Sequence, residues 1–407
     1  MDPFDRLPVE IINIIIEYTA DWFALNSLLE VSPKVTAIFD YSDQEAIRFT
    51  ESALANNSIT RHRLHRLYRM SARLRDPSLT CDNLAEFISR DHAEPFHSPS
   101  EEASVSRTTL RNMVKTASTL QQWACACLTT FLGRTRAVTF RRWTRDTVKQ
   151  RIAGTCIYQP RDAGSPSWVE EYRVYRALWN LQYYADILRA GRRMNWETVG
   201  ASRNFALWGA DVPEDFILEQ EALSVAECIR DILFNDSKKT ISASGDHLAI
   251  LESVALVLDD SFPICLRPPT WAPPEQPDVS ASDDVWKRGF LAVTYNPLNL
   301  FWGSLRDRNT YRKTYFQEVA ITDFRAFRAL GMAVWDLWRL YSLGLWSIRR
   351  LGNGPVTTPD GHEVPQGADP AMAGGESEYR WSVLIQQQNE KETETRCKDE
   401  EEKNYCA

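Results

Sequence analysis

The stretch FDRLPVEIINIIIEYTADWFALNSLLEVSPKVTAIF, residues 4–39, decides how this sequence begins to fold. Its first part predicts a helix. Pro8 suits a first helical position, where a missing N–H costs no hydrogen bond, and Glu10 suits the positive end of the helix dipole. The aliphatic side chains that follow at helical spacing form one broad apolar face: Ile11, Ile12, Ile15 and Ile16.

Two further short helices are predicted in the same stretch. The second rests on apolar residues at helical spacing, Trp22, Leu25, Leu28 and Leu29. Ser32 and Pro33 suit the cap and the first position of the third. Three helices this short cannot bury a sufficient core among themselves. Their remaining apolar surface must therefore meet the rest of the chain or another protein.

The stretch resembles an F-box, whose pattern runs Leu-Pro-x-Glu followed by pairs of aliphatic residues, a leucine and Val-Ser. The matching residues are Leu7, Pro8, Glu10, Ile11, Ile12, Ile15, Ile16, Leu25, Leu28, Val31 and Ser32. Thr19 stands where the family usually has a leucine, and Val35 stands where it often has a tryptophan. The match covers roughly a tenth of the 407-residue chain.

The resemblance implies docking onto a Skp-type adaptor protein, and through it onto a cullin–RING ubiquitin ligase. The residues it assigns to adaptor binding are Leu7, Pro8, Ile11, Ile12, Ile15, Ile16, Leu25, Leu28, Val31 and Val35. Three alternatives stay open. The segment could be an ordinary amphipathic start that packs on its own protein. The chain could be a helical interaction module without a role in a ligase, which uses its Arg-rich region for acidic partners or nucleic acid, or it could be an enzyme of unrecognised class.

The composition is that of a globular protein rather than a membrane or secreted one. The chain has 407 residues, 43% of them hydrophobic and 25% charged, which is ample for a core. No run approaches the length of a membrane span. Asp2 and Asp5 argue against a secretory leader, and eight scattered cysteines suit a reducing compartment. We expect a cytoplasmic or nuclear protein that contacts no membrane.

Charge is distributed unevenly along the chain. Residues 1–56 hold three basic and ten acidic residues, and residues 57–151 hold 17 basic and eight acidic ones. Two groups of basic residues stand out in the second section: Arg61, Arg63, Arg66, Arg69, Arg73 and Arg75, then Arg134, Arg136, Arg141, Arg142, Arg145, Lys149 and Arg151. Clustered arginines can bind phosphates or an acidic partner. We favour pairing within the chain or with protein, and expect no nucleic-acid binding.

The remaining signals are mostly helical. Capping residues and apolar periodicity predict helices over residues 42–56, 60–75, 80–90 (capped by Thr80), 107–132, 139–153 and from 165 onward. The last of these carries aromatic residues at spacings of three and four: Trp168, Tyr172, Tyr175, Trp179 and Tyr183. This aromatic stripe could be a recognition face, but core packing is the favoured interpretation.

The predicted fold is mostly α, with an N-terminal three-helix F-box-like unit followed by an irregular helical body without a recognised repeat. We expect an F-box-like domain over 1–45 and a helical body over 46–351, with a proline-rich linker near 262–283. Residues 352–407 should form an irregular loop, a short return segment and a charged, disordered tail. Residues 330–340, LGMAVWDLWRL, look like a segment found near the end of fungal F-box-like proteins.

A search for catalytic or metal-binding motifs returns nothing persuasive. His62 and His65 have a spacing that can chelate metal, but four arginines lie nearby. Cys125 and Cys127 lie two apart and cannot face each other on a helix. We therefore predict no catalytic, cofactor-binding or metal-binding residues. The predicted function is that of a non-catalytic F-box adaptor, which links an unidentified protein target to a ubiquitin ligase.

Overall fold

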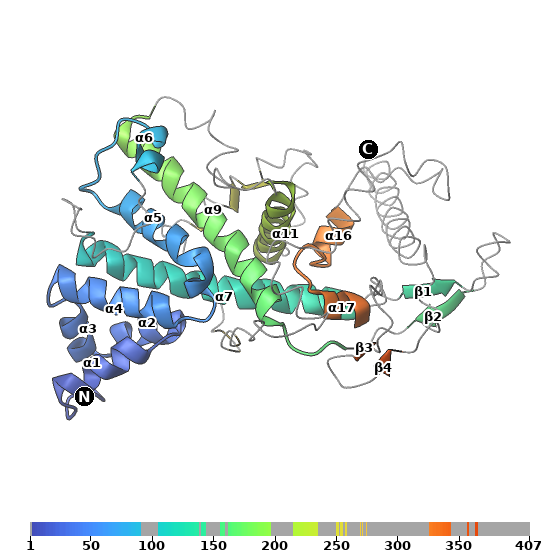
Figure 1. Ribbon diagram of the computed structural model, residues 1–407, viewed down its shortest axis with the longest axis horizontal. Coiled ribbons are helices and arrows are strands. Elements are labelled where there is room, and N and C mark those ends of the chain that lie inside the picture. Colours follow the sequence, from blue (N-terminus) through green and yellow to red (C-terminus); the bar gives the residue numbers. More distant parts are fainter. Residues whose placement is uncertain are drawn as a thin grey trace, which may run out of the picture. The chain divides into compact units, whose positions relative to one another are not determined.

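The computed structural model describes residues 2–90, 105–137, 140–143, 155–158, 162–196, 215–234, 325–342, 356–357 and 363–364, with single residues between 250 and 274. This part of the chain is mostly α-helical, as predicted (Figure 1). It divides into two compact units. Unit 1 contains residues 1–129 and 170–277, and unit 2 contains residues 130–169 and 278–407. One division, between Pro277 and Asp278, falls inside the predicted proline-rich linker.

The three predicted N-terminal helices are present and belong to unit 1. They are α1 (Val9–Tyr18), α2 (Trp22–Val31) and α3 (Pro33–Phe39). Pro8 precedes α1 as its cap rather than occupying its first position. The side chain of Asp21 accepts a hydrogen bond from the Ala24 N–H at the start of α2, and Ser32 does the same for Val35 at the start of α3. Helices α2 and α3 therefore each begin at a residue whose side chain caps the first turn.

The next segment continues unit 1 with α4 (Asp43–Asn56), the π-helical turn η1 (Thr60–Leu64), α5 (His65–Arg75) and α6 (Leu84–Ser89). Ser42 caps α4 as predicted, through the Glu45 N–H. The cap of α6 was predicted wrongly as Thr80. Asn83 occupies that position and accepts from the Glu86 N–H, because its side chain lies three residues before a free helical N–H.

The long helices α7 (Arg107–Ala137) and α9 (Trp168–Met194), together with α11 (Asp215–Phe234), supply most of the remaining core. In unit 1 the Trp22 ring stacks on Tyr68 at a centroid distance of 5.3 Å, and Tyr68 meets Trp179 at 5.4 Å. Aromatic rings from α2, α5 and α9 thus form one continuous interior contact. Such contacts contribute about 0.5–1.5 kcal/mol per pair beyond their buried area.

Several buried charged side chains of unit 1 are paired with opposite charges on other helices. Arg75 donates to Asp186 at 2.8 Å and to Thr116 at 2.7 Å, so it ties α5 to α9 and α7. Burial raises the pKa of Asp186, and the charges of Arg75 and Arg189 oppose that rise. Arg176 forms a two-pronged pair with Glu221 of α11, at 2.7 and 3.0 Å. Losing one partner of such a pair leaves an uncompensated buried charge. These pairs therefore favour one packing arrangement of α5, α9 and α11 over others.

The aromatic stripe of α9 is buried, so the core interpretation is confirmed. All five rings are at most 5% exposed: Trp168, Tyr172, Tyr175, Trp179 and Tyr183. Cys125 and Cys127 on α7 are buried as well, as expected for small core residues. None of these side chains can form a recognition face in the folded chain.

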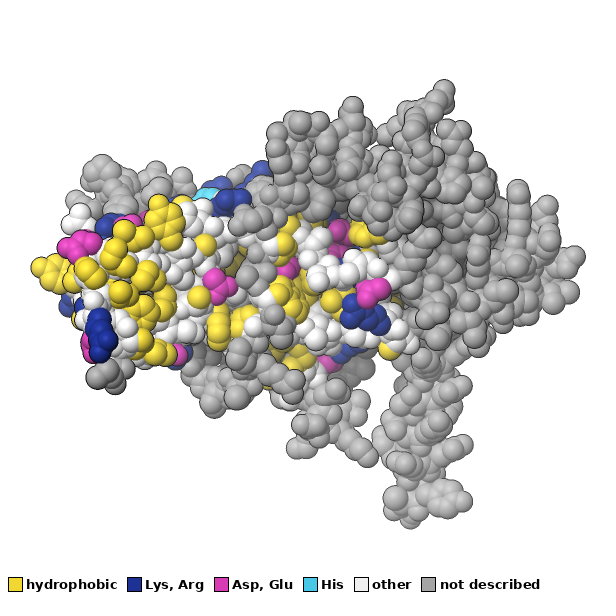
Figure 2. Space-filling model, turned by 90° about the horizontal axis from the view of Figure 1, so that it is seen from below, with side chains coloured by type: hydrophobic (Ala, Val, Ile, Leu, Met, Phe, Trp, Pro, Cys, Tyr) yellow, Lys and Arg dark blue, Asp and Glu magenta, His cyan; other side chains and the backbone are white. Residues whose placement is uncertain are grey.

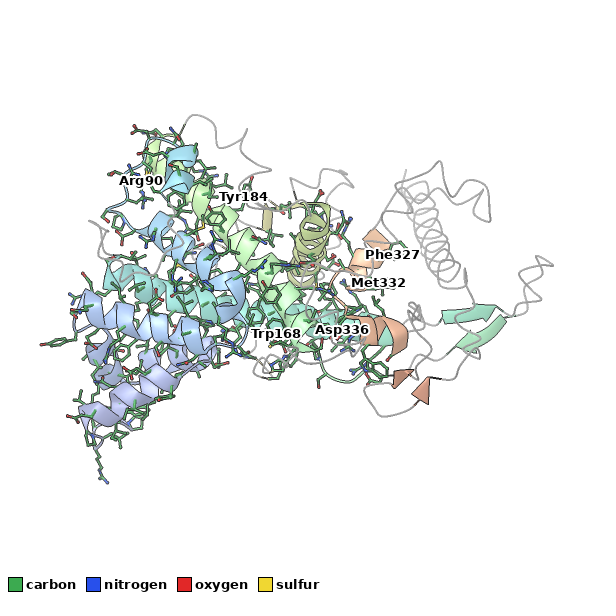
Figure 3. The ribbon with its side chains drawn as sticks, in the orientation of Figure 1. Arg90, Trp168, Tyr184, Phe327, Met332 and Asp336 are labelled. Atoms are coloured by element: carbon green, nitrogen blue, oxygen red, sulfur yellow. The ribbon has the colours of Figure 1, made fainter. Side chains whose placement is uncertain are left out.

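Unit 2 contains the end of α7, the start of α9, and α16 (Arg325–Ala329) and α17 (Leu337–Ser342). Between these two helices Gly331 has φ +71°, and an added Cβ would lie 2.7 Å from Phe131, so only glycine fits. Asp336 accepts from the Arg339 N–H and caps α17, close to the buried Phe327 and Met332 (Figure 3). The predicted helical body is thus present here in short pieces.

Unit 2 also holds short antiparallel strands that were not predicted from the sequence. β1 (Phe140–Trp143) pairs with β2 (Thr155–Tyr158), so the helix predicted over 139–153 is wrong at 140–143. The rest of that predicted helix lies outside the described residues. Aromatic and β-branched residues in both segments favour extended pairing, which outweighs the weak helical pattern. Within the predicted irregular loop, β3 (Val356–Thr357) pairs with β4 (Glu363–Val364). The predicted tail lies outside the described residues.

Candidate docking surface on the N-terminal helices

Helix α1 has two apolar sides with different surroundings. Ile12 and Ile16 are fully buried, whereas Ile11 is 43%, Ile14 is 50% and Tyr18 is 77% exposed. The three exposed residues are spaced three and four apart, which places them on one face of the helix. The sequence predicted a single apolar face over the isoleucines, but the structure uses one part of it as core and leaves another part open.

The exposed large hydrophobic residues of the described chain are concentrated in the N-terminal helices. Every one of them lies between residues 9 and 41: Val9, Ile11, Ile14, Tyr18, Val31 and Tyr41. We call this set the N-terminal apolar surface. Figure 2 shows hydrophobic side chains gathered at the left-hand end, which the N-terminal helices form. Scattered exposed apolar residues need no explanation, but a concentration in one short segment is typical of an interaction site.

The residues predicted for adaptor binding divide into core and surface. Buried are Ile12, Ile16, Leu25 and Val35; half-buried are Leu7, Ile15 and Leu28; exposed are Pro8, Ile11 and Val31. The first group can support a docking surface from behind but cannot contact a partner. The prediction missed four exposed members of the N-terminal apolar surface: Val9, Ile14, Tyr18 and Tyr41. The spacing of Ile11, Ile14 and Tyr18 was the signal that could have found the α1 face.

The start of α1 is fastened to α3 by two charged side chains. The carboxylate of Asp2 accepts from the Ser32 hydroxyl at 2.6 Å and from the Lys34 N–H at 3.0 Å. The hydrogen bond from Ser32 is the main cause that lowers the pKa of Asp2. In return the Lys34 ammonium donates to the carbonyls of Phe4, Asp5 and Leu7, the last at 2.7 Å. The Leu-Pro turn before α1 is therefore held in place.

The other end of α1 is fastened to α4. Ser52 and Asn56 both donate side-chain hydrogen bonds to the carbonyl of Glu17, at 2.8 and 2.9 Å. This satisfies one of the four carbonyls that a helix leaves open at its C-terminus. The Glu17 side chain in turn pairs with Arg48 at 2.8 Å. Both ends of α1 thus have polar anchors, which leaves its exposed apolar face in a fixed orientation.

Helix α2 is joined to the interior of unit 1. The Trp22 indole N–H donates to Thr60 at 3.1 Å, and the Phe23 N–H donates to the side-chain carbonyl of Gln121 on α7, also at 3.1 Å. Asn57 donates to the Ala20 carbonyl at 2.7 Å. The N-terminal helices therefore pack on α4, η1 and α7, and the surface they present is preformed. A preformed surface loses little entropy when a partner binds.

A second kind of candidate, a metal site, has no support among the described residues. No group of three or more His, Cys, Asp or Glu side chains in that part of the chain could hold a metal ion. For the pair weighed from the sequence, burial and the charge of Arg69 lower the pKa of His65. The side chain of His62 lies outside the described set. Among the helices that the structure describes, none has the length and apolar character to cross a bilayer.

Comparison with known proteins adds no relative to these observations: no family model, no curated protein and no solved structure matches the chain.

Proposed function

We propose that this chain is a non-catalytic F-box adaptor, which couples a protein target to a Skp–cullin–RING ubiquitin ligase. The N-terminal apolar surface is the observation that carries the proposal. The exposed face of α1, made of Ile11, Ile14 and Tyr18, would meet the Skp-type adaptor. The buried residues of the same motif, such as Ile12 and Ile16, would hold that face in position.

The energetics of the surface support a docking role. Completely burying one side chain of this size contributes about 1.5–3 kcal/mol. Three of them on one face can therefore provide the centre of a specific interface, provided that the partner is complementary in shape. The polar anchors at both ends of α1 keep the three side chains exposed in the free protein. The resemblance of residues 4–39 to an F-box supplies the identity of the partner.

A division of labour follows from the proposal. One face serves the ligase, and the target binds elsewhere on the helical body between residues 58 and 351. The chain itself makes or breaks no bond; the ubiquitin transfer takes place on other subunits. Such a role belongs in the cytoplasm or nucleus. A helical interaction module that lacks a ligase partner is the competing function, and adaptor capture distinguishes the two.

The experiment uses the full-length chain and a purified Skp-type adaptor. The double variant Ile11→Asp/Ile14→Asp places two charges in the centre of the α1 face without touching the core. We expect capture to fall by about a hundredfold or more, because two buried apolar contacts of this size are lost. Ala85→Asp, on the exposed side of α6, is the matched control and should capture normally.

Circular dichroism must show that both variants remain helical. Undiminished capture by a folded Ile11→Asp/Ile14→Asp protein would contradict the proposal, as would failure of the wild-type chain to bind the adaptor. Binding of the adaptor by wild type but not by the double variant would exclude the competing function. Ile15 is a poorer test position, because it is half-buried and its substitution would disturb folding as well.

A further inference from the structure

The proline-rich segment that was expected to be a linker has two residues in contact with the helices of unit 1. Five of the eleven residues 267–277 are proline, which favours an extended polyproline conformation whose carbonyls form no internal hydrogen bonds. Within this segment Trp271 and Pro274 each form a hydrogen bond with a distant part of unit 1. We call residues 271–274 the strap. They belong to unit 1, which extends to Pro277.

Three side chains from separate parts of unit 1 hold the strap. The Trp271 indole N–H donates to the carboxyl group of Glu171 on α9 at 2.6 Å. The Cys125 thiol of α7 donates to the Trp271 carbonyl at 3.9 Å, a weak sulfur hydrogen bond. The Ser58 hydroxyl donates to the Pro274 carbonyl at 2.9 Å. Two of these contacts bind backbone carbonyls of an extended chain, and the third binds the tryptophan side chain.

The strap tryptophan lies at the surface of unit 1 and not in its core. Trp271 is half-buried, whereas the other tryptophans that the structure describes in unit 1 are at most 7% exposed: Trp22, Trp123, Trp179 and Trp196. Separate proline-rich peptides bind proteins in a similar way, because the polyproline conformation is preformed and loses little entropy. The strap is therefore held as a bound peptide would be, although it belongs to the same chain.

Glu171 makes this site selective for an N–H donor. Its carboxyl group is buried, at 1% exposure, and within the described chain the Trp271 indole is its hydrogen-bond donor. A buried carboxyl group that has no donor costs free energy. A ligand that takes the place of the strap must therefore bring its own donor. Tryptophan supplies one together with a large apolar ring, whereas phenylalanine or leucine would leave the carboxyl group unsatisfied.

The strap leaves a second polar group near its tryptophan without a hydrogen bond. Tyr175 lies one turn after Glu171 on α9, and its buried hydroxyl has no hydrogen-bond partner in the described part of the chain. Burial is the main cause that raises the pKa of this phenol, and negative charge at Glu171 and Cys125 adds to the rise, so the group lies near both contacts of Trp271. With the strap in place the hydroxyl is out of reach of a partner. A ligand that also bonds to it would bind more tightly than the strap.

We infer that the strap occupies a peptide-binding site of unit 1, and that this site accepts a tryptophan-containing, proline-rich segment of a partner protein. The strap covers the site until such a segment replaces it. A segment of the same chain has an effective concentration of about a millimolar, so weak ligands are excluded and a better-matched one can still bind. A second copy of the chain offers no better match, because its strap has the same sequence.

This inference does not depend on the ligase proposal. The partner would be the target if the chain is an F-box adaptor, and an ordinary partner if it is not. Peptide binding is measured on the free chain, whereas adaptor capture is measured with the Skp-type protein. Failure of one measurement therefore leaves the other intact.

The test is fluorescence anisotropy with the full-length chain and a labelled peptide of its own residues 267–277, RPPTWAPPEQP. Trp271→Ala should raise the affinity for this peptide about tenfold or more over wild type, because the competing internal contact is lost. Trp271→Phe keeps the ring and removes the N–H, and it should raise the affinity about threefold. Circular dichroism checks both variants, and Trp271→Phe decides the matter if Trp271→Ala does not fold.

A matched pair of substitutions, each made in the Trp271→Ala chain, tests the site itself. Ser58→Ala removes the donor to the Pro274 carbonyl and should weaken peptide binding about threefold or more. Ser89→Ala removes an exposed hydroxyl that bonds to its own helix, α6, and should leave the affinity unchanged. A peptide with alanine in place of tryptophan should not bind.

Several results would overturn the inference. They are equal affinity of wild type and both Trp271 variants, absence of binding to all three, equal binding of the alanine peptide, and equal effects of Ser58→Ala and Ser89→Ala. A wild-type dimer that Trp271→Ala abolishes would overturn it as well, because the strap of a second copy would then be the occupant of the site.

Discussion

Helices α1 and α9 carry the same kind of sequence signal and use it in opposite ways. Each presents large apolar side chains at spacings of three and four, Ile11, Ile14 and Tyr18 on α1 and the aromatic stripe on α9. The α9 stripe is core, whereas the α1 side chains are about half exposed or more. Periodicity therefore identifies a face that needs a partner. It does not say whether the partner lies in the same chain.

Length and position explain the difference. Helix α9 has 27 residues and has buried residues on all sides. Helices α5 and α11 supply partners for its charged side chains, and α5 also for Trp179. Helix α1 has ten residues and lies at the margin of unit 1, where α3 and α4 cover only the side of Ile12 and Ile16. A short helix at the margin of a fold keeps one apolar side open.

The largest expected effect concerns the buried aromatic stripe of α9. Trp179→Ala removes a ring that is 1% exposed and in contact with Tyr68. We expect the free energy of unfolding to fall by about 3–5 kcal/mol, from lost burial and the cavity left behind. Denaturant unfolding of the purified chain measures it. A loss below about 1 kcal/mol would mean that the α9 stripe is not a packed core.

The next prediction compares the buried side of α1 with its exposed side. Ile16→Ala should lower the free energy of unfolding by about 2–5 kcal/mol, because Ile16 is fully buried. Ile14→Ala, two residues away on the exposed face, should change it by no more than about 0.5 kcal/mol. Its effect should appear instead in adaptor capture. Similar destabilisation by both substitutions would show that the exposed face is covered in the free protein, which would remove the basis of the docking proposal.

Local signals predicted the helices of unit 1 well, because helix starts are encoded within a few residues. Ser32 and Ser42 cap the helices that they were expected to cap. Which side of a helix packs against which neighbour was not encoded in that way. Nothing in the spacing of Ile11, Ile12, Ile15 and Ile16 says which pair meets α4. Likewise, the six similar arginines between residues 61 and 75 gave no hint that Arg69 and Arg75 would pair with carboxylates of other helices, or that Arg63 would have a left-handed backbone.

Local secondary-structure propensity alone could not predict the strand pair β1–β2. Residues 140–143, FRRW, fit a helix and a strand about equally as an isolated segment. Their pairing with 155–158 decides the outcome, and a partner twelve or more residues away cannot be recognised from local periodicity. The docking surface was only partly predicted for a related reason. The family pattern mixes residues that support the surface with residues that form it.

The smallest expected effect is a pH dependence of stability that comes from one buried acidic residue of α9. Glu171 of α9 is buried beside Glu170 and accepts a hydrogen bond from the Trp271 indole at 2.6 Å. Burial is the main cause that raises its pKa to about 8, from 4.5 in the unfolded chain. The folded protein therefore keeps this proton over a pH range in which the unfolded chain has released it. The stability contribution of Glu171 is complete below pH 4.5 and is lost as pH rises from 4.5 to about 8.

Glu171→Gln should remove this dependence while its side-chain oxygen still accepts from Trp271. Relative to wild type, we expect the variant to gain about 1–3 kcal/mol in free energy of unfolding between about pH 5 and pH 8. Ala85→Gln, on the exposed side of α6, is the control: it removes no titratable group, so its difference from wild type should stay constant with pH. Urea unfolding at several pH values measures both. A constant difference for Glu171→Gln as well would mean that water reaches this carboxyl, and that the start of α9 is less enclosed than its aromatic neighbours indicate.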